Sequence, residues 1–183
     1  MNLHIDTRLK KLGDPQRSFM WELLIPQVNK VSSVIKDPMD LSIRVRSVSL
    51  PGRGNETITS NYMGMKQLFA GKATYGNTIT LSIEEFQDFK GWRTFYDWSQ
   101  LIFDTNPNHP RGGASNAIQK SGTGGYAVPV YLQMKKFSGD DHNFRFKIVN
   151  AFPSQLEDIS LDYTNSDSIK FNVTLTYDFV VIE

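Results

Sequence analysis

The chain has 183 residues, a formal net charge of +1 at pH 7 and no cysteine. This length suits one domain with a sizeable core. The near-neutral charge gives no bulk electrostatic reason to bind nucleic acid or an acidic membrane. The lack of cysteine excludes disulfides and thiolate metal sites, and no apolar run approaches the ~20 residues of a membrane-spanning helix. We therefore expect a single domain that does not engage a membrane.

The first part of the chain predicts one short helix and two strands. Residues 4–13 form a candidate helix that ends at Gly13-Asp14-Pro15. Residues 19–25 are apolar and aromatic and predict a strand that stops at Pro26. Residues 41–50 alternate apolar and polar side chains, which predicts a second strand. Its alternation slips by one step at Arg46-Ser47, as a β-bulge would cause.

Residues 56–84 predict a hairpin. One arm would span 56–70 and the other 77–84, with the tip near Tyr75-Gly76-Asn77. The apolar period then changes to three or four residues, which predicts a helix over 85–103. Phe89, Trp92 and Trp98 are expected to face the sheets. Gly91 inside this helix costs roughly 1 kcal/mol relative to alanine, so we expect a close packing contact there.

Residues 104–126 contain two prolines and five glycines, so they predict a long exposed loop that the fold does not need. Strands are expected over 127–137 and 143–150, and a short one around 159–163. The chain ends in one long predicted strand over 169–181, with apolar side chains at every second position. The predicted fold class is mainly β: an antiparallel β-sandwich or small barrel with one flanking helix. A final strand of roughly 40 Å favours a protein that builds a wall with its neighbours.

No constellation of catalytic or metal-binding residues is visible in the sequence. The three histidines are far apart, and Asp140-Asp141-His142 is better explained as a polar turn. Gly71-Lys72-Ala73-Thr74 lacks the earlier glycine of a phosphate loop. A mildly basic stretch from Arg44 to Lys72 fits a solvated or subunit-contact surface better than a nucleic-acid groove. We therefore expect no enzyme, no metal and no cofactor.

The order of segments resembles a known family. Those segments are FMWELLIP, RSVSLPG, NYMGMKQLFAG, NTITLSIEE, a helix with FxxWRTFYDW, and PSQLEDISLDYTNSDSIKFNVTLTYDF. Together they are similar to the T4-type phage tail tube proteins, whose relatives form the inner tubes of contractile injection systems. The resemblance covers residues 15–183, apart from the loop 104–126. Residues 1–15 would be an N-terminal arm of a single domain over 1–183.

The resemblance implies a hexameric ring and a stack of rings that forms a hollow tube. Sheets of neighbouring subunits would join into one barrel around the lumen, through which DNA or a protein effector passes without specific binding. A sheath would lie outside, with baseplate or terminator proteins at the ends. The tube would belong to a virion assembled in the host bacterial cytoplasm. The family has no catalytic residues to carry over.

An inner wall must not grip sliding DNA, because dense phosphate contacts bind tightly. The small and mostly neutral side chains of the predicted hairpin suit such a wall. The candidate lumen-facing residues are Glu56, Thr57, Thr59, Asn61, Thr78, Thr80, Ser82 and Glu84. Other side chains of the same hairpin are apolar or basic and suit contacts between subunits or rings. These candidates are Tyr62, Met63, Met65, Lys66, Leu68 and Lys72.

Two alternatives to a tube protein remain open from the sequence. A tube initiator of the baseplate, or a tube terminator, would share the fold and the residue pattern. A monomeric carbohydrate-binding β-sandwich with exposed aromatic side chains is a different class. Assembly of the purified protein without a template favours the tube, whereas a monomer that binds glycans favours the last alternative.

Overall fold

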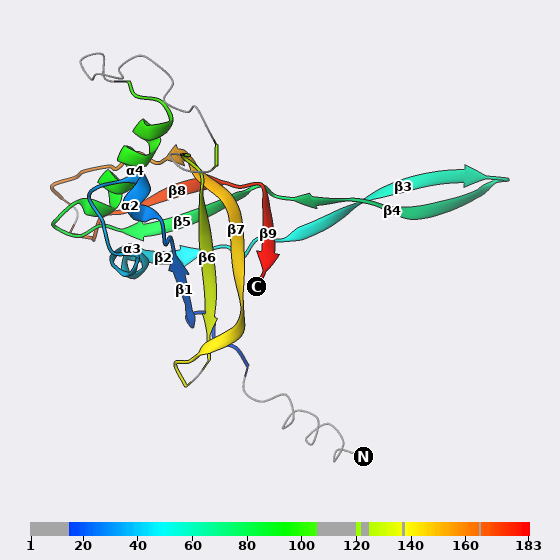
Figure 1. The fold of residues 1–183 in the computed structure, drawn as a ribbon, viewed down its shortest axis with the longest axis horizontal. Coiled ribbons are helices and arrows are strands. Elements are labelled where there is room, and N and C mark those ends of the chain that lie inside the picture. Colours follow the sequence, from blue (N-terminus) through cyan, green and yellow to red (C-terminus); the bar gives the residue numbers. More distant parts are fainter. Residues whose placement is uncertain (1–14, 106–119, 122–124, 137, 165) are drawn as a thin grey trace.

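The computed structural model describes residues 15–105, 120–121, 125–136, 138–164 and 166–183. The helix predicted over 4–13 and most of the loop 104–126 lie outside these residues. The described chain forms a body of antiparallel sheets with helices on one side, and a long hairpin that projects far from it (Figure 1). None of the described helices is long and apolar enough to cross a membrane.

Seven strands form the body, and every pairing between them is antiparallel. Their order is β1-β6-β7-β8-β5-β2, with β9 paired to β7. The strands are β1 (Trp21–Leu24), β2 (Val45–Val48), β5 (Thr78–Glu84), β6 (Val128–Lys135), β7 (Asp141–Leu156), β8 (Lys170–Thr176) and β9 (Phe179–Ile182). The predicted fold class is confirmed.

Strand β7 joins two sheets. Its first part pairs with β6 and β9, and its last residues pair with β8. Close to this change of partner, Asn150 has a φ of 57°, the left-handed conformation that asparagine tolerates better than most residues. The Asn150 side chain donates a hydrogen bond of 2.8 Å to Asp178, in the link between β8 and β9. This contact holds the point where the chain passes from one sheet to the other.

The core lies between these sheets and helix α4 (Lys90–Ile102). Strands β5 and β8 contribute paired apolar side chains that are at most 2% exposed: Ile79 with Leu175, Leu81 with Val173 and Ile83 with Phe171. Helix α4 adds Phe95 and Trp98, both fully buried. Trp98 therefore packs as predicted and Trp92 is partly buried, but Phe89 is 39% exposed and precedes the helix.

Helix α4 begins five residues after its predicted start, because Glu85 accepts hydrogen bonds from its first turn. The backbone N–H groups of Gly91 and Trp92 donate to the Glu85 carboxylate at 3.2 and 2.6 Å. These are donors that a helix leaves without intrahelical partners. A Cβ at position 91 would lie 2.8 Å from Glu85 Oε2. The close packing contact predicted for Gly91 is confirmed.

The strand predicted over 41–50 is half helix. Helix α3 (Pro38–Arg44) follows a short helix, α2 (Val28–Val31), and only β2 is extended. Asp37 caps α3 by accepting from the Met39 N–H at 2.9 Å, and proline occupies the first helical position. This capping outweighed the alternation of the following residues. The bulge is confirmed, since the β2 register shifts between Val45 and Ser47.

Three predictions about the strands were wrong: the position of the hairpin tip, the length of the final strand and the short strand around 159–163. The hairpin turns at Met63-Gly64 and joins β3 (Arg53–Tyr62) to β4 (Met65–Tyr75), while β5 returns to the main sheet. The final strand breaks after Thr176, because the Asp178 N–H donates to Val149 on β7. Residues 159–163 are irregular, and β7 extends to Leu156 instead.

Candidate assembly surfaces

The hairpin β3–β4, here called the ribbon, is the most exposed element of the described chain. It extends away from the body as two paired strands (Figure 1), and every residue of β3 is exposed. Met63 and Gly64 at its tip both have positive φ, 47° and 78°. Two such residues give the primed turn whose twist matches antiparallel strands. An isolated two-stranded hairpin is at best marginally stable, so we expect contacts with other protein chains to stabilise this ribbon.

The two faces of the ribbon differ in polarity. Directly paired residues share a face, and one face holds Ile58 with Phe69, Ser60 with Gln67, and Tyr62 with Met65. The opposite face holds Thr57 with Ala70, Thr59 with Leu68, and Asn61 with Lys66. Three of the predicted lumen residues, Thr57, Thr59 and Asn61, thus share the more polar face, while Glu56 lies on the more apolar one.

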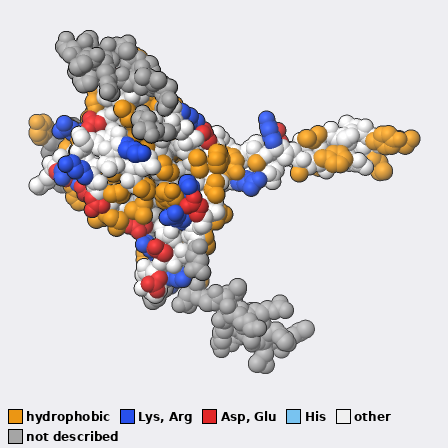
Figure 2. Space-filling view, in the orientation of Figure 1, with side chains coloured by type: hydrophobic (Ala, Val, Ile, Leu, Met, Phe, Trp, Pro, Cys, Tyr) orange, Lys and Arg blue, Asp and Glu red, His pale blue; other side chains and the backbone are white. Residues whose placement is uncertain are grey.

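Large apolar side chains of the ribbon are open to solvent, as Figure 2 shows along its outer half. Met63 at the tip is 86% exposed. The others that are more than half exposed are Ile58, Tyr62, Met65, Leu68 and Phe69. All six predicted contact residues, including Lys66 and Lys72, lie on this ribbon or at its tip. Contiguous exposed apolar surface of this kind marks an interaction surface.

A β-bulge sits near the base of the ribbon. The register shifts between Asn55 and Thr57, so that Glu56 faces both Gly71 and Lys72. A Cβ on Gly71 would come within 3.1 Å of the Glu56 backbone oxygen, so a larger side chain at this position would crowd the facing strand. Lys72 lies 3.5 Å from the Glu56 carboxylate. Both side chains are exposed, and such a pair contributes little to stability.

The outer face of β5 and β8 is polar and almost free of charge. Thr78, Thr80 and Ser82 are paired with Thr176, Thr174 and Asn172, respectively. These are the predicted lumen residues on β5, and they lie on the body rather than on the ribbon. Glu84 ends the row opposite Lys170. Hydrogen bonds from Ser168 and then Arg46 lower the pKa of Glu84, which keeps this carboxylate ionised.

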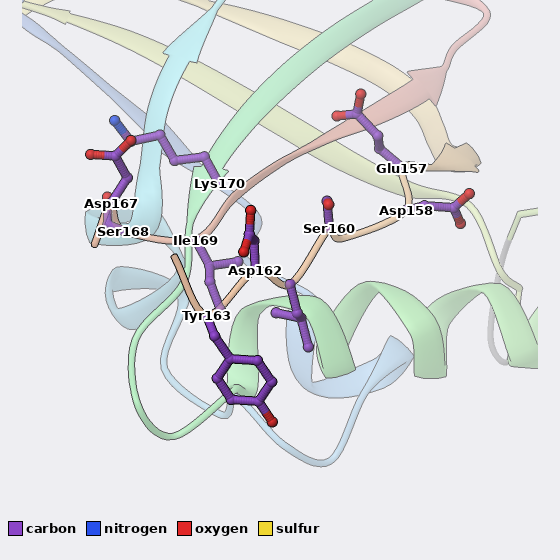
Figure 3. Close-up of a pocket in the computed structure, with 10 residues that line it drawn as sticks. Glu157, Asp158, Ser160, Asp162, Tyr163, Asp167, Ser168, Ile169 and Lys170 are labelled. Atoms are coloured by element: carbon purple, nitrogen blue, oxygen red, sulfur yellow. The ribbon is translucent and has the colours of Figure 1, made fainter. Parts of the chain in front are cut away.

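An acidic segment, residues 157–170, was not predicted as a functional surface. It contains Glu157, Asp158, Asp162 and Asp167, with Lys170 at its end, and it lines an open cleft (Figure 3). Tyr163 is fully exposed and Leu161 is 73% exposed. Hydrogen bonds from the Thr164 N–H and hydroxyl lower the pKa of Asp162. The sequence feature that could have identified this segment as a surface of interest is its four carboxylates within eleven residues.

A buried ion cluster ties α3 to the start of α4. Arg44 Nη1 donates to Glu85 at 3.0 Å, and its two terminal nitrogens donate to Asp88 at 2.8 and 2.6 Å. The hydrogen bonds from Arg44 hold the pKa of Asp88 well below its usual range, and the same bonds raise the pKa of Arg44. All buried polar side-chain atoms that the structure describes have partners. The cluster is therefore a structural clamp.

The described residues contain no group of three potential metal ligands from His, Asp and Glu. His142 is near the start of β7 and contacts Gln16 at 3.1 Å, while His4 and His109 lie outside the described residues. Gly71-Lys72-Ala73-Thr74 lies within β4 at the bulge, away from any helix start. These residues make contacts within strands and turns. The exposed surfaces described above are suited to association with other protein chains.

Comparisons with solved structures show where this fold occurs. A chain of the extracellular contractile injection system PVC, in its sheath–tube complex, is 20% identical with a TM-score of 0.62, covering 97% of each chain. A chain from the anti-feeding prophage tube-terminating cap is also 20% identical with a TM-score of 0.62, covering 93% of this chain and 91% of that one. A chain of the PVC sheath/tube terminator has the same TM-score at 18% identity, covering 94% and 99%.

Curated protein sequences yielded no significant match to this chain. The family model described as phage tail tube protein matches residues 15–183, which is nearly the whole chain. The match includes the ribbon, the polar face of β5 and β8, helix α4 and the acidic segment. Its fold and its exposed association surfaces agree with a structural role. The chain therefore belongs to the phage tail tube protein family.

Proposed function

We propose that six copies of this tube protein form a ring and that rings stack into a hollow tube for a genome or an effector. The observation behind this proposal is the projecting ribbon, which exposes large apolar side chains along its outer half. Fully burying one large apolar side chain stabilises by about 1.5–3 kcal/mol. Six such side chains on neighbouring copies would offset a substantial part of the cost of association.

Open strand edges support the ring. The path of the main sheet ends at β1 and β2, whose outer edges have no partner strand among the described residues. Unpaired edges are templates for pairing with another chain. A closed cyclic assembly covers every such edge with a neighbour's strand. We therefore propose that sheets of adjacent subunits join edge to edge around the lumen.

The polar face of β5 and β8 is our proposed lumen wall, together with the polar face of the ribbon. Thr80 and Ser82 are small and neutral, and their partners Thr174 and Asn172 are neutral as well. Such a wall offers few phosphate contacts, whose salt-dependent grip would slow a moving nucleic acid. The lumen assignment extends to Glu84, whose negative charge would repel phosphate, but it leaves out Glu56, which lies on the other face of the ribbon.

The similar solved structures suggest which other proteins the tube contacts. The similar chains belong to a sheath–tube complex, a sheath/tube terminator and the baseplate of the anti-feeding prophage, the last at 12% identity and a TM-score of 0.62. We propose that the surface away from the lumen faces a sheath and that the tube ends meet terminator and baseplate proteins. The tube would assemble in the host bacterial cytoplasm.

Assembly of the purified protein tests these proposals. Native mass spectrometry should detect a hexamer, and negative-stain electron microscopy should show tubes that form without a template. Rings that never extend alone, but bind to preformed tube ends, would instead identify an initiator or terminator. A stable monomer that binds glycans would contradict the assembly and favour the carbohydrate-binding alternative.

A further inference from the structure

We propose that the tip of the ribbon docks onto the acidic segment, residues 157–170, of a second copy in the next ring. This inference rests on the proposed stacking of rings and names the two surfaces that meet. The tip is formed by Tyr62, Met63, Gly64, Met65 and Lys66. The partner of the tip is thus another copy of this chain, and the copies are placed head to tail along the tube.

The two surfaces lie at opposite ends of one sheet. Strands β5 and β8 run antiparallel from the pair Thr78–Thr176 to the pair Glu84–Lys170. The ribbon connects to β5 at the first of these ends, and the acidic segment enters β8 at the second. Figure 1 shows the ribbon and this segment on opposite sides of the body. A contact between two different surfaces that does not close on itself propagates as a stack.

The charges of the two surfaces are complementary. The tip carries one charged side chain, Lys66, whereas the other charged residues of the ribbon, Arg53, Glu56 and Lys72, lie toward its base. The acidic segment carries four carboxylates and one lysine. Figure 3 shows the carboxylates of Glu157, Asp158 and Asp162 spread along the cleft. Complementary charge between Lys66 and these carboxylates would steer association and fix its register.

The apolar parts of the two surfaces also match. Tyr62, Met63 and Met65 are exposed at the ribbon tip. Leu161 and Tyr163 project from the acidic segment, where they line the open cleft of about 1070 Å³. Methionine side chains adapt to irregular surfaces and contact aromatic rings favourably. An apolar centre with charged groups around it is the usual arrangement of a protein interface.

Cysteine crosslinking tests the contact, because the natural chain has no cysteine. The variant Met63→Cys/Tyr163→Cys carries one thiol on each surface. A disulfide needs Cα atoms within about 7 Å of each other, whereas the ribbon and the acidic segment of one copy lie on opposite sides of the body. Mild oxidation of assembled protein should produce a ladder of covalent oligomers. Each single variant should stop at dimers or monomers. The control pair Met63→Cys/Ser138→Cys places its second thiol on the exposed β6–β7 turn and should give no ladder.

The outcomes separate this inference from the proposed stacking. Intact tubes without a ladder, or with equal ladders in the test and control pairs, would overturn the docking while leaving the stack in place. Rings that never stack would overturn the proposed function itself. A ladder specific to the Met63–Tyr163 pair supports both.

Charge reversal provides a second measurement. Lys66→Glu and Asp162→Lys should each reduce the sedimentable tube at least tenfold, and the double variant should regain most of it. Asp158→Lys serves as a second acidic position, because Asp162 also accepts hydrogen bonds from Thr164. Lys30→Glu, on α2, is the matched control. Normal tubes from the acidic variants that no longer bind sheath would assign the segment to the sheath and overturn the proposal.

Discussion

The carboxylate of Glu85 occupies the space that a side chain at Gly91 would need. Glu85 accepts hydrogen bonds from the N–H groups of Gly91 and Trp92 and from Arg44. A Cβ at position 91 would lie 2.8 Å from Glu85 Oε2. The Phe86 N–H is a fourth donor to it, at 3.1 Å. Because four donors hold this buried carboxylate, it cannot move aside without losing bonds.

We therefore expect Gly91→Ala to destabilise the protein by about 1–3 kcal/mol, the usual cost of overpacking. Helix propensity alone predicts a gain of about 1 kcal/mol. Urea unfolding followed by circular dichroism measures the difference. Gly76→Ala is the control, since a Cβ there meets no atom within 4 Å. A more stable Gly91→Ala protein would show that Glu85 does not need this space.

Replacement of Trp98 should be far more costly than replacement of Phe89. Trp98 is fully buried, and its indole N–H donates to Tyr126 at 2.7 Å. Trp98→Ala should lower the free energy of unfolding by about 3–5 kcal/mol. Phe89→Ala, at a 39% exposed position, should cost much less. Similar unfolding midpoints for the two variants would contradict the position of α4 on the core.

Acid should weaken the clamp between α3 and α4. Arg44 holds the pKa of Asp88 below its usual range, so Asp88 contributes stability above its unfolded pKa of about 3.9. That contribution is lost as pH falls through and below this value. Asp88→Asn should therefore be less stable than the natural chain at pH 7, and the difference should shrink toward pH 2–3. A constant difference across this range would exclude the ion pair as its cause.

The proposed lumen can be tested with single cysteines at Thr59 and Thr80. Thr80 lies on the outer face of β5 and Thr59 on the polar face of the ribbon. A maleimide reagent too large to enter the tube should label both slowly in intact tubes and rapidly after disassembly. Lys30→Cys on α2 is the exposed control. Rapid labelling of Thr80→Cys along intact tubes would place this face outside the lumen.

Alternation in the sequence identified the faces of the central strands correctly. Phe171, Val173 and Leu175 are buried and their alternate neighbours are not, because side chains of any strand alternate between faces. The helical period identified α4, and the close packing at Gly91 was predicted from its unfavourable propensity. These features depend on residues near one another in the chain.

The tertiary structure alone decided how the strands connect. The alternation of residues 169–181 continues past Thr176, yet the chain breaks where Tyr177 bonds to Asn77 and Asp178 bonds to Val149. The hairpin tip lies at Met63-Gly64 rather than at Tyr75-Gly76-Asn77, because Asn77 turns β5 back to the main sheet. Local periodicity determines which face of a strand is apolar. Partners distant in sequence determine where strands end, and they place the ribbon and the acidic segment at opposite ends of one sheet.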